Sequence, residues 1–167
     1  LPGLPNRIEG YDISNIQGTE HVLKACAGVE GGRRVLIAST SEVYGKNPKD
    51  ALSEDDDRVL GSARLSRWFY ASAKAIDEAF ALAYWQEQRL PVTVVRLFNT
   101  VGARQTGRYG MVVPRFVRWA MRSEPLRVYG DGEQTRCFTN VHDVVHALVT
   151  LMDTPSAAGE IFNIGQP

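Results

Sequence analysis

Three observations in the sequence predict an α/β fold built on a parallel sheet. Short apolar runs at residues 34–39, 92–98 and 161–164 are typical of strands that are buried on both faces. Between these runs lie segments whose apolar side chains recur every three or four residues, as they do in amphipathic helices. Strands that alternate with helices of such length indicate βαβ units, in which the strands run parallel.

The first half of the chain divides into a strand, a loop and a long helix. Residues 34–39 are the first predicted strand. Residues 46–64 are polar and show no sustained period, so they predict a loop. From Ser66 onward the apolar spacing predicts a helix that ends near Arg89, because Pro91 cannot continue it.

The second half repeats this alternation with shorter elements. The β-branched run at 92–98 predicts a strand. Residues 111–123 predict a helix, and residues 126–129 predict a brief strand that a glycine-containing turn closes. Apolar side chains within 141–152 form one helical stripe, and residues 161–164 predict the last strand.

Composition excludes several classes of protein. The chain has 167 residues, 44% of them hydrophobic, which suits one globular domain with a buried core. Its 19 basic and 19 acidic residues balance, so no overall field draws the chain to nucleic acid. No apolar run reaches the ~18 to 20 residues of a membrane span, and we expect a cytoplasmic protein without a membrane partner.

Cysteine and histidine residues give no pattern of metal ligands. Cys26 and Cys137 lie far apart and outside any Cys-x-x-Cys spacing, which disfavours both a zinc site and a disulfide framework. His142 and His146 form a pair without further ligands, so we predict a solvated or core role for them. The sequence therefore predicts no metal site.

Tyr70 and Lys74 are the first residues that indicate chemistry. Both lie in the predicted long helix at a spacing that places their side chains on the same face. An ammonium group beside a phenol stabilises the phenolate and lowers the phenol's pKa, which lets a tyrosine exchange a proton with a substrate hydroxyl. Taken alone, the pair can also be a solvated helix face.

A second polar segment follows the first predicted strand. Residues 38–45, Ala-Ser-Thr-Ser-Glu-Val-Tyr-Gly, lie at the carboxyl end of that strand, where open α/β sheets bind ligands. Together with Tyr-x-x-x-Lys at 70–74, this segment resembles the extended short-chain dehydrogenase/reductase family of nucleotide-sugar epimerases, dehydratases and decarboxylases. The resemblance covers about residues 18–167 and implies a Rossmann-like fold with NAD as the cofactor.

The resemblance implies a role for each polar residue of the predicted site. Thr40 would hydrogen-bond the reacting sugar hydroxyl, Tyr70 would be the base, and Lys74 would bind the nicotinamide ribose and tune the tyrosine. Glu42 is a further catalytic candidate. The residues expected to bind the cofactor are Ser39, Tyr70, Lys74 and Thr100, and those expected to bind a UDP- or dTDP-sugar are Asn99, Tyr129 and Arg136.

Two motifs bear on the reaction type. In Thr40-Ser41-Glu42 a serine stands where the family's dehydratases have aspartate, whereas the decarboxylases share Thr-Ser-Glu. The decarboxylases usually have Tyr-Asp-Glu-Gly-Lys-Arg around the tyrosine, where this chain has Tyr-Ala-Ser-Ala-Lys-Ala, and an arginine at the position of Met111. We therefore expect an epimerase of the UDP-glucose 4-epimerase type, with a UDP-glucuronate decarboxylase as the alternative.

The phosphate-binding signature of the family is missing from the sequence. Neither Gly-x-Gly-x-x-Gly nor Gly-x-x-Gly-x-x-Gly occurs. We therefore expect a truncated Rossmann-like fold that lacks the amino-terminal Gly-rich βαβ half. Its predicted parts are a leader at 1–17, the carboxyl-terminal part of the NAD-binding domain at 18–110, and part of the sugar-binding region at 111–167. A catalytically incompetent binding or oligomerisation domain is a second hypothesis.

The leader suggests a third hypothesis. Residues 7–18 resemble the opening strand of the RNase H-like nuclease domain found in the bacterial nucleotide excision repair endonuclease. In that resemblance Asp12 is a metal-binding carboxylate, but one carboxylate cannot form a two-metal site.

The long helix also suggests self-association. Members of the family commonly pack this helix against its copy, so we expect a homodimer. Candidate contact residues are Trp68, Phe80, Ala81 and Trp85, whose alternative role is in the core of the chain.

Overall fold

The computed structural model describes residues 6–29, 33–107 and 111–166, with side chains from residue 16 onward. The predicted α/β fold is confirmed. Three parallel strands, β1 (Val35–Thr40), β2 (Val92–Leu97) and β5 (Ile161–Ile164), form one sheet in the order β1-β2-β5. The carboxyl ends of parallel strands meet at one edge of the sheet, so the residues that follow them lie near one another.

Register and burial explain why these segments are strands. Val35 pairs with Val92, and Val94 pairs with Ile161, which places β-branched side chains side by side. Strand β2 is the middle strand and is buried over its first five residues. Strands β1 and β2 precede residue 110 and β5 follows it, so regions on both sides of that predicted boundary form one sheet.

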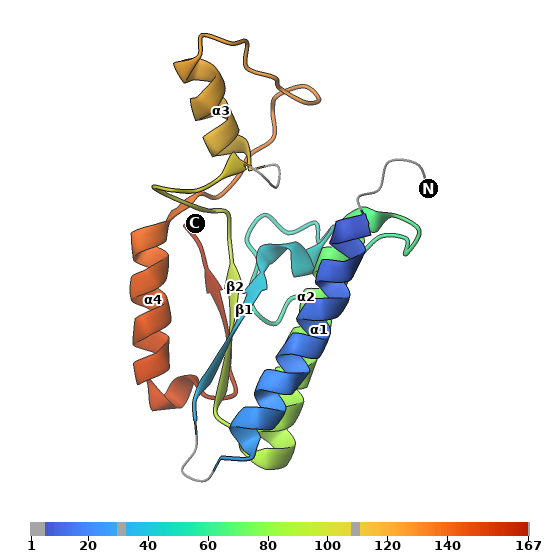
Figure 1. Ribbon diagram of the computed structural model, residues 1–167, viewed down its shortest axis with the longest axis vertical. Helices are drawn as coiled ribbons and strands as arrows, with labels where there is room; N and C mark the ends of the chain where they lie inside the picture. The colour runs from blue at the N-terminus through green and yellow to red at the C-terminus, as the bar shows by residue number, and fades with distance from the viewer. Residues whose placement is uncertain (1–5, 30–32, 108–110, 167) are drawn as a thin grey trace.

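Helices cover both faces of the sheet. Helices α1 (Asn6–Ala27) and α2 (Phe69–Gln88) lie side by side on one face, and α4 (Val141–Asp153) lies on the other (Figure 1). The side chain of Asn140 accepts a hydrogen bond from the backbone of His142 and caps α4 at 2.9 Å. The main core lies between the α1–α2 layer and the sheet, and its buried members are Leu23, Val35, Ile37, Ala81, Leu90, Val92 and Val94.

The segment between β1 and α2 is irregular, as predicted. A short 3₁₀ helix, η1 (Ser41–Tyr44), follows β1 directly, and η2 (Ser66–Trp68) leads into α2. Between them the chain folds back so that Gly45 bridges to Val59. Gly45 has φ of 63°, and a Cβ there would lie 2.4 Å from the Val59 carbonyl oxygen, so this turn requires glycine.

A small second layer stands at the carboxyl end of the sheet. Strands β3 (Thr100–Val101) and β4 (Thr139–Asn140) pair in parallel, and α3 (Val112–Met121) projects beyond them (Figure 1). The sequence did not predict β3 and β4, because two residues are too few to show a period.

The strand predicted at 126–129 is wrong. These residues have no regular secondary structure and belong to no sheet, and Leu126, Val128 and Tyr129 are 49%, 58% and 73% exposed. Apolar alternation favours a strand only where a partner strand offers its backbone groups, and here none of the described strands lies alongside.

The nuclease hypothesis is also wrong. Residues 6–27 form one helix, so the segment at 7–18 is not a strand. In the part of the chain that the structure describes, no three His, Cys, Asp or Glu side chains gather in a way that could hold a metal ion. The leader instead continues into the helix that covers α2.

The proposed dimer face is wrong in its residues. Trp68 and Ala81 are 6% and 0% exposed, and Phe80 and Trp85 pack against the main core. Trp68 and Ala81 are therefore buried inside the chain, and Phe80 and Trp85 are partly buried at the edge of the core. The homodimer stays a prediction, without them as its contact surface.

Two further observations concern the cysteines and the helices. Cys26 and Cys137 are free thiols. No helix in the described part of the chain has the length and apolar character needed to cross a membrane.

Candidate functional site

Most predicted site residues lie at or near the carboxyl end of the sheet. Ser39 and Thr40 are the last residues of β1, and Thr100 begins β3 just beyond β2. Helix α2 carries Tyr70 and Lys74 in its first two turns and packs against both β1 and η1. The structure therefore brings the hydroxyl segment after β1 and the Tyr-x-x-x-Lys helix together, although they are separate in sequence.

The two residues of the Tyr-x-x-x-Lys motif remain accessible. Tyr70 is 38% exposed, and the side chain of Lys74 is 17% exposed. The Lys74 ammonium lies 3.3 Å from a carboxylate oxygen of Asp77, which is fully buried. A phenol and an ammonium that solvent can reach are also groups that a ligand can reach.

The hydroxyl group of Thr40 can act both as a hydrogen-bond acceptor and as a donor. Its oxygen accepts a hydrogen bond of 3.2 Å from the backbone of Glu42 and so caps η1. Within the described residues the hydroxyl hydrogen has no acceptor, so it can donate there as the predicted contact with a sugar hydroxyl requires. Ser39 differs, because its buried hydroxyl donates to Glu78 at 2.5 Å.

Glu42 follows Thr40 at the start of η1. Partial burial raises the pKa of its carboxyl group, and the positive charge of Arg67 offsets only part of this increase. A carboxyl group whose pKa is raised exchanges protons more readily near neutral pH than an ordinary glutamate does.

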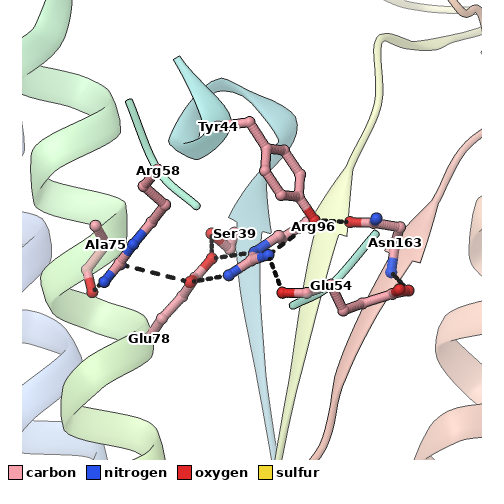
Figure 2. Close-up of polar contacts among 8 residues, drawn as sticks. All are labelled: Ser39, Tyr44, Glu54, Arg58, Ala75, Glu78, Arg96 and Asn163. Atoms are coloured by element: carbon pink, nitrogen blue, oxygen red, sulfur yellow. Dashed lines mark hydrogen bonds and ion pairs between the residues drawn. The ribbon is translucent and has the colours of Figure 1, made fainter. Parts of the chain in front are cut away.

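A buried ion pair connects α2 to the middle of the sheet (Figure 2). The Arg96 guanidinium donates to both carboxylate oxygens of Glu78, at 3.0 and 2.9 Å. Both side chains are almost fully buried, at 4% and 3% exposure. Burial by itself lowers the pKa of Arg96, but the hydrogen bonds to Glu78 and Tyr44 outweigh it, so the pKa is raised and the guanidinium stays charged.

The pair extends into a network that reaches β5 and the loop after η1 (Figure 2). Arg96 also donates to the Tyr44 hydroxyl at 2.8 Å and to the Glu54 carbonyl oxygen at 2.9 Å. The Tyr44 hydroxyl donates in turn to the Asn163 side chain at 2.7 Å. The carboxylate of Glu54 accepts from the Asn163 backbone, also at 2.7 Å. One arginine thus ties three strand ends and a loop to the helix that carries Tyr70.

This network was missed in the sequence, although a signal was present. Arg96 interrupts an otherwise apolar strand, and a charged residue there must find a partner when the strand is buried. Glu78 follows Lys74 by four residues on the same predicted helix. The pattern does not say which acid meets which base, because that depends on how the helix packs against the sheet.

Asn99 and Thr100 line a small cavity of about 50 Å³, together with Met111 and residues of α3. The Thr100 hydroxyl oxygen is buried and has no hydrogen-bond partner among the described residues. Such an unpaired group carries a desolvation cost that a ligand could remove. This observation agrees with a ligand-contacting role for Thr100.

Tyr129 and Arg136 lie elsewhere, in the exposed segment between α3 and β4. The Arg136 guanidinium donates at 2.6 Å to the carbonyl oxygen of its neighbour Thr135, which is a local contact. A larger hollow of about 530 Å³ lies between the loop after β3 and α3. Its basic lining residues, which sequence reasoning did not select, are Arg104, Arg118 and Arg122.

Comparisons with known proteins agree with this geometry. Residues 6–165 match the NAD dependent epimerase/dehydratase family. A UDP-N-acetyl-alpha-D-glucosaminuronate decarboxylase of Bacillus cytotoxicus is 48% identical over 153 residues, which are 91% of this chain and 46% of that protein. The UDP-glucuronic acid decarboxylase 1 of Xenopus tropicalis is 38% identical over 92% of this chain and 35% of its own length.

A solved structure shows the same fold. The UDP-glucuronic acid 4-epimerase of Bacillus cereus, in complex with UDP-glucuronic acid and NAD, superposes with a TM-score of 0.85 at 29% identity and covers 98% of this chain. This chain spans 49% of that structure and about a third to a half of the curated relatives named above. The match over residues 6–165 shows that the chain belongs to the NAD dependent epimerase/dehydratase family.

Proposed function

We propose that this chain provides the catalytic side of a site that oxidises the C4 hydroxyl of a UDP-linked uronic acid. The observation that carries the proposal is the packing of α2, with Tyr70 and Lys74, against the end of β1 that carries Thr40. Thr40 and Tyr70 would both contact the sugar hydroxyl. Tyr70 would take its proton while Lys74 stabilises the phenolate.

The residues present fit one end of NAD. When bound, NAD accepts the hydride that leaves C4 of the sugar. Lys74 would hold the nicotinamide ribose, and the unpaired, buried Thr100 hydroxyl would gain a partner at the cofactor. The sequence has no Gly-rich phosphate turn, so no residue of the chain is assigned to the NAD pyrophosphate.

The substrate class is inferred from the relatives. The two named decarboxylases and the Bacillus cereus epimerase all have a uronic acid in their names. Oxidation at C4 of such a sugar places a ketone β to the C6 carboxylate, and a β-keto acid loses carbon dioxide readily. Loss of carbon dioxide from this keto-sugar followed by return of the hydride to C4 therefore gives a UDP-pentose, whereas return of the hydride to the opposite face without that loss gives the C4 epimer.

Decarboxylation is our first candidate for the outcome. The Bacillus cytotoxicus decarboxylase matches 91% of this chain at 48% identity, and Thr40-Ser41-Glu42 agrees with the decarboxylase motif. Epimerisation at C4 is the second candidate. Met111, which stands where decarboxylases have arginine, and the epimerase structure favour it.

Product analysis tests both candidates. The chain is incubated with UDP-glucuronate and excess NAD, and the nucleotide sugars are separated and identified by NMR. We expect a UDP-pentose with an equal amount of carbon dioxide. A C4 epimer without carbon dioxide would support the second candidate. The absence of both products would contradict the proposed function.

A further inference from the structure

Asp77 has an unusual environment for a carboxylate. Its side chain is 0% exposed, and one oxygen, Oδ2, lies 3.3 Å from the Lys74 ammonium. The other oxygen, Oδ1, is buried without a hydrogen-bond partner among the described residues. A buried carboxylate is costly unless a positive charge compensates it. Lys74 is therefore the group that makes the burial of Asp77 possible.

The neighbouring charges are already engaged with each other. Glu78, the next residue, binds Arg96 through both oxygens and also accepts from Ser39. Arg96 uses its remaining contacts on Tyr44 and the Glu54 carbonyl. The two adjacent acids of α2 thus have separate cations: Glu78 pairs with Arg96 and, at 3.9 Å, with Arg58, whereas Asp77 pairs with Lys74.

Helix geometry places this second pair in line with Tyr70. Residues 70, 74 and 77 follow the i, i+4, i+7 spacing of one helix face. A free lysine side chain samples many rotamers, and fixing it costs conformational entropy. Because the buried Asp77 carboxylate anchors the ammonium, the Lys74 side chain has already lost this conformational entropy in the folded chain, before any ligand binds.

We infer that Asp77 is a positioning residue, which anchors the Lys74 ammonium on the face of α2 that carries Tyr70. The inference deepens the proposed function and rests on it for its meaning, because Lys74 matters there as the ribose-binding and phenolate-stabilising group. Asp77 itself is assigned no contact with substrate or cofactor. It acts through Lys74.

Amine acylation tests the inference without any ligand. The chain has four lysines, at positions 24, 46, 49 and 74, so trace labelling with acetic anhydride and mass spectrometry resolves each of them. In Asp77→Asn the ammonium loses the buried carboxylate that anchors it, so the side chain moves more freely into solvent. We expect Lys74 to be acylated on the order of tenfold faster, as the loss of one hydrogen bond between charged groups implies, with the other lysines unchanged.

The exposed pair of Lys24 and Glu20 gives a matched control. Its ammonium lies 2.6 Å from the carboxylate, but both side chains are well exposed. Glu20→Gln, which removes a carboxylate from a different lysine, should leave the acylation of Lys74 unchanged. An unchanged rate at Lys74 in a folded Asp77→Asn chain would overturn the inference.

A measurement on the unmodified chain covers the case in which Asp77→Asn does not fold. With lysine labelled by ¹⁵N, the Lys74 ammonium should exchange slowly with water and give an NH₃⁺ signal at a pH where Lys46 and Lys49 give none. An equally fast exchange at Lys74 would also overturn the inference. Neither measurement needs NAD, so a chain that protects Lys74 but yields no sugar product contradicts the proposed function and supports the role of Asp77.

Ligand affinity separates positioning from general stability. In a chain that binds both ligands, Asp77→Asn should weaken NAD binding about tenfold, as the loss of one hydrogen bond between charged groups implies, and leave the dissociation constant for UDP-glucuronate unchanged. Asp77→Glu keeps the charge and should restore part of the NAD affinity. An equal loss for both ligands would indicate a merely structural role.

Discussion

The guanidinium of Arg96 and the carboxylate of Glu78 form a bidentate ion pair, with two hydrogen bonds of 3.0 and 2.9 Å. Arg96 comes from the middle strand β2, and Glu78 comes from α2, two turns beyond Tyr70. The pair therefore fixes the rotation and height of the helix that carries Tyr70 and Lys74 relative to the strand ends (Figure 2).

Removing one partner of this pair should be costly. In Arg96→Met the buried Glu78 carboxylate loses both hydrogen bonds from Arg96 and keeps only the more distant, partly exposed Arg58 at 3.9 Å, so we expect a loss of about 3 to 5 kcal/mol in the free energy of unfolding. Urea denaturation measures it. The double variant Arg96→Met/Glu78→Leu should lose clearly less than the sum of the two single variants. Additive losses would show that the two side chains do not depend on each other.

Tyr70→Phe should abolish turnover and preserve binding. The variant loses only the phenolic hydroxyl, which is the proposed base, and general acid–base groups contribute roughly 10²- to 10⁴-fold to rate. The product assay with UDP-glucuronate measures the first effect, and calorimetry with the same sugar nucleotide measures the second. Tyr84→Phe, on the same helix but packed against the core, is the matched control. Retained turnover in Tyr70→Phe would remove Tyr70 from the base role.

Glu42 should make the chain less stable as the pH rises. Burial raises its pKa in the folded state, so between the ordinary glutamate pKa and the raised value the folded chain binds more protons than the unfolded chain. Its contribution is therefore present at low pH and is lost as the pH rises through that window. Glu42→Gln removes this term, so the variant should gain stability relative to the parent as the pH increases. Parallel curves from pH 4 to pH 8, roughly the range around a raised carboxyl pKa, would contradict the shift.

Gly159 should not tolerate a side chain. It has φ of +87°, its amide donates to the Val92 carbonyl at 2.7 Å, and a Cβ would lie 2.1 Å from the Trp85 indole nitrogen. We expect Gly159→Ala to lose about 1 to 3 kcal/mol from backbone strain alone, with a further cost of displacing the indole. Gly18→Ala is the control, because nothing lies within 4 Å of its Cβ position in α1. That control should gain about 0.5 to 1 kcal/mol.

The sequence predicted those elements whose signal is local and repeated. Strand β1 was expected at 34–39 and is Val35–Thr40, and the long helix ends at Gln88, just before Arg89. The exposed segment at 126–129 was mistaken for a strand, because its apolar alternation says nothing about a partner. Two-residue strands such as β3 are fixed by tertiary pairing and leave no pattern.

The sequence predicted the motif residues of the candidate site but not the ion pairs around them. Tyr70, Lys74 and Thr40 could be selected because a motif fixes their types and spacing. The Lys74–Asp77 and Arg96–Glu78 pairs could not be assigned, since two acids and two bases allow more than one pairing until α2 docks on the sheet. The roles assigned to all of the predicted site residues stay predictions, those of Thr40, Tyr70 and Lys74 included.

Titration of the chain with NAD tests the central claim most directly. That claim is that Lys74, held beside Tyr70 at the carboxyl end of the sheet, binds the nicotinamide ribose. Calorimetry should show saturable NAD binding by the unmodified chain, weakened by about tenfold or more in Lys74→Met, as the loss of a charged hydrogen bond predicts. No binding by the unmodified chain, or equal affinity in both proteins, would contradict the claim.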